Sequence, residues 1–74
     1  MEKTITELEK GEDIVRVSLT EFRGRQYIDV RLFYMDGEGN WKPTKKGITL
    51  SPEMMRTVRE AVDEALESLS ESSD

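Results

Sequence analysis

The 74-residue sequence contains no cysteine, no histidine and no apolar run near the length of a membrane span. Without cysteine no disulfide can stabilise the chain, and without either residue type the usual zinc ligands are missing. A membrane helix needs about 20 consecutive apolar residues, and the first residues lack the charged-then-apolar order of a signal peptide. We therefore expect a soluble, unexported, cytoplasmic protein without a metal ion or other cofactor.

Motifs for catalysis and for phosphate or calcium loops are also missing. There is no cysteine nucleophile, no histidine base and no evident carboxylate pair in settings that would separate their pKa values. No glycine-rich run enters a helix ahead of Lys-Ser or Lys-Thr. The acidic turn at 36–40 does not fit an EF-hand, because Trp41 stands at the sixth place and Gly47 at the twelfth. We expect a protein that is not an enzyme.

The length allows one small domain. A domain of this size buries only about 60% of the surface of its unfolded chain, so oligomerisation is a natural way to stabilise it. We expect a single domain over residues 1–69 and an acidic, serine-rich tail over residues 70–74, which has nothing to bury.

Alternating or β-prone stretches predict several antiparallel strands at residues 4–8, 14–22, 27–35 and 41–50. Gly24 can take the positive φ of a hairpin turn, and Pro43 is best tolerated at an edge or an irregularity of the sheet. A period of two places Val15, Val17 and Leu19 on a core-seeking face. The opposite face should carry Arg16, Ser18, Thr20 and Phe22, with Arg31 beside them on the returning strand.

A helix should start at Ser51-Pro52-Glu53, since Ser51 can cap free amides and Pro52 suits the first helical position. Apolar residues then recur at helical spacing, at Met54, Met55, Val58, Ala61, Val62, Ala65, Leu66 and Leu69. We expect this stripe to form core and dimer contacts, chiefly through Met55, Val58, Val62 and Leu66.

Aromatic rings stand beside positive charges three times between residues 22 and 46, at 22–25, 33–34 and 41–46. A nucleobase offers a flat face that stacks on a ring, while its phosphate attracts Lys or Arg. The chain has a net charge of −5, yet residues 16–46 carry seven basic and four acidic residues, a net +3. Because surface charges are screened beyond about 8 Å, the local field decides binding. The pattern favours a nucleic-acid partner.

Five motifs follow one another along the chain: Phe22-Arg23-Gly24-Arg25, Ile28-Asp29-Val30-Arg31, Tyr34-Met35-Asp36, Lys42-Pro43 and the run from Lys45 to Glu53. In order and spacing they resemble the signature of the positive cofactor four family of single-stranded-DNA-binding transcriptional coactivators, and the resemblance runs from about Ile14 to the end of the helix. The resemblance implies an α+β fold, a curved four-stranded antiparallel sheet followed by one C-terminal amphipathic helix. It also implies a homodimer that binds single-stranded or unpaired DNA with little sequence preference. The chain looks like a short bacterial member.

The resemblance also implies roles for single residues. Phe22 and Tyr34 match rings that stack on bases. The residues that it implies for holding phosphates are Arg23, Arg25, Arg31, Lys42 and Lys46, with Lys45 beside them. Alternation along the strand adds Arg16 to the nucleic-acid-binding residues. Two positions depart from the family pattern, because Thr20 stands where animal members have a basic residue and Thr44 stands at a common glycine.

Alternation conflicts with the resemblance at one position. It puts Arg31 and Phe33 on one face and Tyr34 on the other, whereas the resemblance brings both Arg31 and Tyr34 to the nucleic acid. A β-bulge or a strong twist would reconcile them. Without either, Tyr34 belongs to the core and Phe33 becomes the candidate platform, while Trp41 is better suited to cross-strand packing.

Two other functions stay open at this point. RNA would satisfy the same rings and cations unless contacts to the 2′-hydroxyl are required. The chain could instead be a protein-interaction module that docks a transcription or replication partner through its helix. The sequence does not decide which pathway uses the protein.

Overall fold

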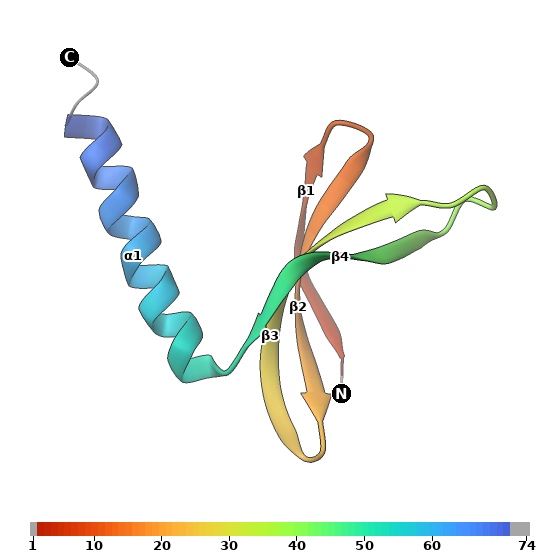
Figure 1. The fold of residues 1–74 in the computed structure, drawn as a ribbon, viewed down its shortest axis with the longest axis horizontal. Coiled ribbons are helices and arrows are strands. Elements are labelled where there is room, and N and C mark those ends of the chain that lie inside the picture. The colour runs from red at the N-terminus through yellow and green to blue at the C-terminus, as the bar shows by residue number, and fades with distance from the viewer. Residues whose placement is uncertain (1, 72–74) are drawn as a thin grey trace.

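The computed structural model describes residues 2–71, which form a four-stranded antiparallel sheet and one long helix (Figure 1). The elements are β1 (Lys3–Lys10), β2 (Asp13–Phe22), β3 (Arg25–Met35), β4 (Trp41–Leu50) and α1 (Pro52–Glu71). Each strand pairs with the next one along the chain, in the order β1-β2-β3-β4. The predicted α+β fold is confirmed. Residues 72–74 of the expected tail lie outside the described residues.

The turn between β2 and β3 is tight. Arg23 and Gly24 both have positive φ, 54° and 79°, as a type I′ hairpin requires. Phe22 consequently lies opposite Arg25, which places a ring and a cation at the same tip. The turn between β3 and β4 is closed by the carboxylate of Asp36, whose Oδ1 accepts hydrogen bonds from the amides of Glu38 at 2.8 Å and Asn40 at 2.9 Å.

A bulge interrupts the pairing of β3 with β4. Arg31 lies opposite Gly47 and Phe33 lies opposite Pro43, so β4 places residues 44–46 where β3 has only Leu32. Thr44 stabilises this irregularity, because its Oγ1 donates to the Leu32 carbonyl at 2.8 Å and accepts from the Lys46 amide at 3.0 Å. The expectation for Pro43 is confirmed, because β4 is an edge strand and Pro43 borders the bulge.

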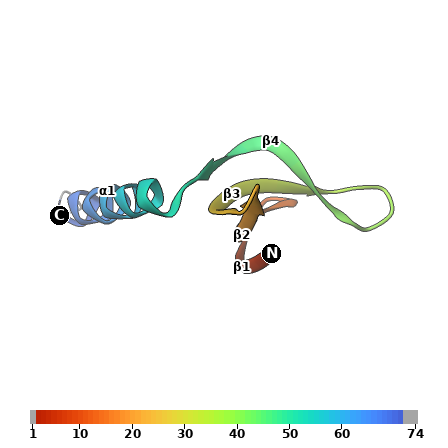
Figure 2. The ribbon, with the colours of Figure 1, turned by 90° about the horizontal axis from the view of Figure 1, so that it is seen from below.

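Helix α1 begins as predicted. The amide of Met54 donates to the Ser51 Oγ at 3.3 Å, and the amide of Met55 donates to the Ser51 carbonyl at 2.9 Å. The helix then runs away from the sheet, and its contacts with the strands are confined to β3 and β4 (Figure 2). Within residues 2–71, no helix is both long and apolar enough to cross a membrane.

The apolar core of a single chain is very small. Ile14, 6% exposed, is the one buried apolar side chain among residues 2–70. The expected core face of Val15, Val17 and Leu19 is only partly covered, because no second layer lies on it and a sheet needs one to bury that face. Ile14 lies on the opposite face of the same inner strand, between Glu9 and Phe33.

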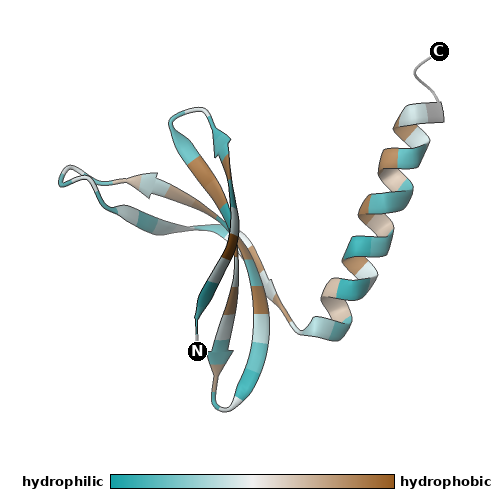
Figure 3. Cartoon of the chain, turned by 180° about the vertical axis from the view of Figure 1, so that it is seen from behind, coloured by the Kyte–Doolittle hydropathy of each residue, from teal (hydrophilic) through white to brown (hydrophobic). Residues whose placement is uncertain are grey.

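The helical stripe is likewise uncovered within one chain. Apolar residues recur along one side of α1 (Figure 3). Met55 is half-buried, whereas Val58, Val62 and Leu66 are 40%, 50% and 59% exposed. These residues form no core of their own, and their contact with a second copy stays a prediction.

Candidate nucleic-acid interface

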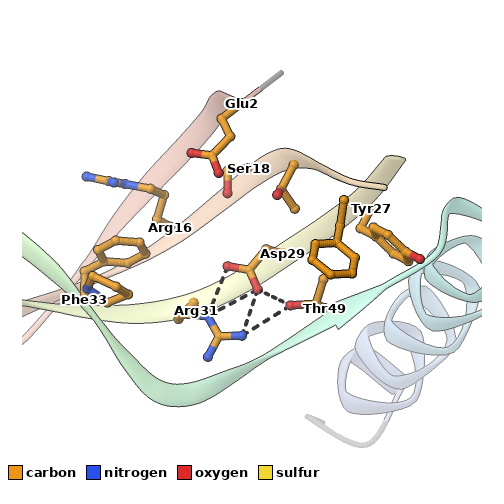
Figure 4. Close-up of a pocket in the computed structure, with 11 residues that line it drawn as sticks. Glu2, Arg16, Ser18, Tyr27, Asp29, Arg31, Phe33 and Thr49 are labelled. Atoms are coloured by element: carbon orange, nitrogen blue, oxygen red, sulfur yellow. Dashed lines mark hydrogen bonds and ion pairs between the residues drawn. The ribbon is translucent and has the colours of Figure 1, made fainter. Parts of the chain in front are cut away.

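An open groove of about 640 Å³ lies on the face of the sheet that carries Arg16 and Phe22 (Figure 4). Directly opposite residues in an antiparallel pair share a face, and the register pairs Arg16 with Arg31, Ser18 with Asp29 and Thr20 with Tyr27. The groove is lined by Glu2, Arg16, Ser18, Thr20, Phe22, Tyr27, Asp29, Arg31, Phe33, Pro43 and Thr49. The expectation that Arg16, Phe22 and Arg31 share one face is confirmed.

Arg31 is held by a network of hydrogen bonds in the groove. Its Nη2 lies 2.9 Å from Asp29 Oδ1, and its Nε lies 3.2 Å from both carboxylate oxygens. Thr49 Oγ1 donates to Asp29 Oδ1 at 2.6 Å and accepts from Arg31 Nη2 at 3.3 Å. Arg31 Nη1 donates to the Thr44 carbonyl at 2.9 Å. Figure 4 shows the three side chains of this network facing one another.

Arg16 lies at one end of the groove. Its Nε is 2.7 Å from Glu7 Oε2, and its guanidinium carbon is 4.2 Å from the centroid of the Phe33 ring. The Glu7 side chain is 41% exposed, and ion pairs of that kind contribute about 0–1 kcal/mol. Arg16 can therefore exchange this carboxylate for a phosphate at little cost while the Phe33 ring stays in the groove.

The β2–β3 hairpin tip lies at the other end. Phe22 is 61% exposed, and the guanidinium carbon of Arg23 lies 5.1 Å from its ring centroid. Arg25 stands directly opposite Phe22. An exposed ring beside two cations suits a base and its phosphates.

The basic residues of β4 form a separate group in a single chain. Lys42 lies opposite Tyr34, with its Nζ 4.0 Å from Asp36 Oδ2. Lys46 lines a smaller depression of about 260 Å³ together with Val15 and Val30, which belong to the other face of the sheet. Lys45 is exposed. Of the predicted site residues, only Arg16, Phe22 and Arg31 line the groove. Arg23 and Arg25 stand beside Phe22 at the hairpin tip. Tyr34, Lys42, Lys45 and Lys46 lie apart from the lining.

The bulge does not bring Tyr34 into the groove. The extra residues are on β4, so alternation along β3 is unbroken, and Phe33 shares the groove with Arg31. Tyr34 is 45% exposed on the opposite face, so it belongs neither to the groove nor to a core within one chain. The expectation that Arg31 and Tyr34 share one surface is not met in the single chain.

Tyr27, Asp29 and Thr49 line the groove but were not named as site residues from the sequence. Tyr27 could have been found, because it alternates with Asp29 and Arg31 along β3 and so lies on the same face of the strand. The hydrogen bond between Asp29 and Thr49 could not have been found, because it depends on a register that the bulge shifts.

Trp41 pairs with Met35 across the strands, which is the packing arrangement expected for it.

Comparison with known sequences identifies one family. Residues 10–61 match the family described as Transcriptional Coactivator p15 (PC4). An RNA polymerase II transcriptional coactivator of Arabidopsis thaliana, KIWI, is 41% identical over 58 residues, which cover 74% of this chain and 53% of that protein. One of Drosophila melanogaster is 42% identical over 53 residues, 72% of this chain and 47% of its own. The chain spans about half the length of these curated relatives.

Solved structures agree with this comparison. A PC4 homologue from Burkholderia pseudomallei superposes with a TM-score of 0.80 at 36% identity, covering 88% of this chain and 97% of that one. The bacteriophage T5 homologue of PC4, implicated in recombination-dependent DNA replication, has a TM-score of 0.68 at 31% identity, covering 96% and 80%. The sequence match and the shared fold together show that the chain belongs to the PC4 family of transcriptional coactivators.

Proposed function

We propose that two copies of this chain form a homodimer that binds single-stranded DNA with little sequence preference, in transcription or another DNA transaction. One observation carries this proposal: the groove places the rings of Phe22, Tyr27 and Phe33 on one face with Arg16, and Arg23 and Arg25 stand beside Phe22 at its tip. Membership of a family of transcriptional coactivators supports it. That family is described by its part in transcription and not by a catalysed reaction.

The chemistry of the groove favours an unpaired strand. Stacking needs bases whose faces are accessible, and in a duplex those faces are covered by neighbouring base pairs. Rings accept any base, and cations contact the phosphates that every nucleotide carries, so the arrangement gives little sequence preference. A chromosomal partner would place the protein in the cytoplasm, associated with the nucleoid.

Dimerisation is supported by what a single chain leaves exposed. Val58, Val62 and Leu66 are 40–59% exposed on α1, and Ile48 is 51% exposed on the apolar face of the sheet. Large apolar side chains left exposed along one side of a helix mark an interaction site. A second copy would provide the missing layer, and it would place two grooves on one particle.

Titration of a labelled oligo-dT and of a matched duplex at moderate salt tests the proposal, with light scattering to measure the particle mass. We expect tight binding to the single strand, weak binding to the duplex and a mass of two chains. Competition with unlabelled RNA tests the choice between DNA and RNA. If RNA displaces oligo-dT as well as DNA does, the protein does not distinguish ribose from deoxyribose. Failure to bind either strand would favour the rival function, in which the exposed stripe of α1 docks a protein partner.

A further inference from the structure

The groove contains a buried carboxylate, that of Asp29, which phosphate binding alone does not require. Asp29 is 9% exposed and is the one buried polar or charged side chain among residues 2–70. A carboxylate repels a polyanion, and its burial is costly unless it is paired and hydrogen-bonded. Asp29 meets that condition through Arg31 and Thr49. Its position therefore has to be explained by what it does to these two partners.

Arg31 is poorly placed to act as a free cation. Asp29 and Thr49 occupy its Nε and Nη2, and the Thr44 carbonyl occupies one proton of Nη1. A guanidinium has five N–H donors, so little remains for a phosphate. The carboxylate 2.9 Å away also balances its charge. Arg31 instead bonds the backbone of the neighbouring strand β4, at the Thr44 carbonyl.

The backbone that it holds is the bulge. Bulged residues lose regular ladder partners, and here the Thr44 carbonyl is bonded by Arg31 while the Lys46 amide is bonded by Thr44 Oγ1. Lys45 and Lys46 belong to this segment. A fixed segment loses less conformational freedom when its lysines bind a ligand.

We propose that Asp29, assisted by Thr49, is a positioning residue for nucleic-acid binding. Asp29 orients Arg31, and Arg31 fixes the bulge at 44–46 and with it the lysines of β4. The proposal rests on the proposed function and assigns a role within the same site. It differs from a simple electrostatic effect, in which Asp29 only lowers the positive potential of the groove.

Two substitutions with the same change in charge separate these explanations. Asp29→Asn and Glu7→Gln each remove one carboxylate that pairs with a groove arginine. We expect Asp29→Asn to weaken oligo-dT binding by about two- to tenfold, as for lost hydrogen bonds that order a binding segment, without a steeper salt dependence. Glu7→Gln, which frees Arg16 and leaves the bulge intact, should bind as well as the wild type or more tightly.

The hydroxyl of Thr49 gives a second pair of variants. Thr49→Val removes the donor to Asp29 with little change in shape, and Thr49→Ser keeps it. We expect weaker binding for Thr49→Val and wild-type binding for Thr49→Ser. This pair decides the question if Asp29→Asn does not fold.

Amide hydrogen exchange provides a readout that needs no nucleic acid. In folded Asp29→Asn or Thr49→Val, the amides of residues 44–47 should exchange faster, while those of β1 and β2 and all amides of Glu7→Gln stay as in the wild type. Unchanged exchange at the bulge, or unchanged or tighter oligo-dT binding in these folded variants, would overturn the inference. A wild-type protein that binds no oligo-dT would overturn the proposed function instead, and exchange would still decide whether Asp29 orders the bulge.

Discussion

Truncation of Phe22 is the sharpest single-residue test of the groove. The side chain is 61% exposed at the hairpin tip, and full burial of a phenylalanine contributes about 1.5–3 kcal/mol. Phe22→Ala should therefore lower the free energy of unfolding by only about 1 kcal/mol, so that the variant stays folded. Stacking on one base contributes about 1–3 kcal/mol, so the dissociation constant for oligo-dT should rise about 5- to 140-fold.

Fluorescence anisotropy of a labelled oligo-dT at fixed salt measures this loss, and circular dichroism checks the fold. Phe22→Tyr keeps the ring and should bind like the wild type, whereas Phe22→Leu keeps apolar volume without a π-face and should bind like the alanine variant. The salt dependence should not change, because Phe22 carries no charge. A folded Phe22→Ala protein with wild-type affinity would refute base stacking at the hairpin tip.

Three further results are expected. Phe33→Ala should weaken oligo-dT binding more than Tyr34→Ala does, because the Phe33 ring lies in the groove; equal or reversed losses in the same titration would contradict this. Gly47→Ala should destabilise the fold by about 1–3 kcal/mol in thermal or denaturant unfolding, because a Cβ there would lie 2.7 Å from the Val30 carbonyl oxygen. Gly37→Ala, which meets open space, is the control, and equal stability of the two variants would count against the close approach of β3 and β4. Leu66→Asp should give a single-chain mass in light scattering at micromolar concentration, since Leu66 is 59% exposed in one chain; a mass of two chains would show that the stripe is not the dimer contact.

Local patterns in the sequence predicted most of the fold. A period of two indicated β2 and β3 because alternation depends only on neighbouring residues, and Ser51-Pro52 marked the helix start because a cap acts within one turn. The extent of the core could not be predicted in this way. Alternation identified the apolar face with Val15, but whether that face is covered depends on a second layer that a single chain does not supply.

The groove was predicted only where the alternation of side chains along a strand was sufficient to assign their face. Alternation placed Arg16 of β2 and Arg31 of β3 on the same face, and the structure pairs these two residues. It failed at β4, because the bulge is stabilised by contacts between residues far apart in sequence, such as Arg31 Nη1 with the Thr44 carbonyl. No local pattern reveals which strand holds the extra residues, so the faces of Lys42 and Lys46 could not be assigned from the sequence.

The salt dependence of oligo-dT binding tests the central claim most directly. Five of the predicted phosphate-binding residues are exposed, namely Arg23, Arg25, Lys42, Lys45 and Lys46, whereas Arg31 is paired with Asp29. At about 0.7 per neutralised phosphate, four to six contacts predict that log K falls against log salt with a slope of about −3 to −4. A slope near zero, or equal affinity for single strand and duplex, would contradict a surface built to hold an unpaired nucleic-acid strand.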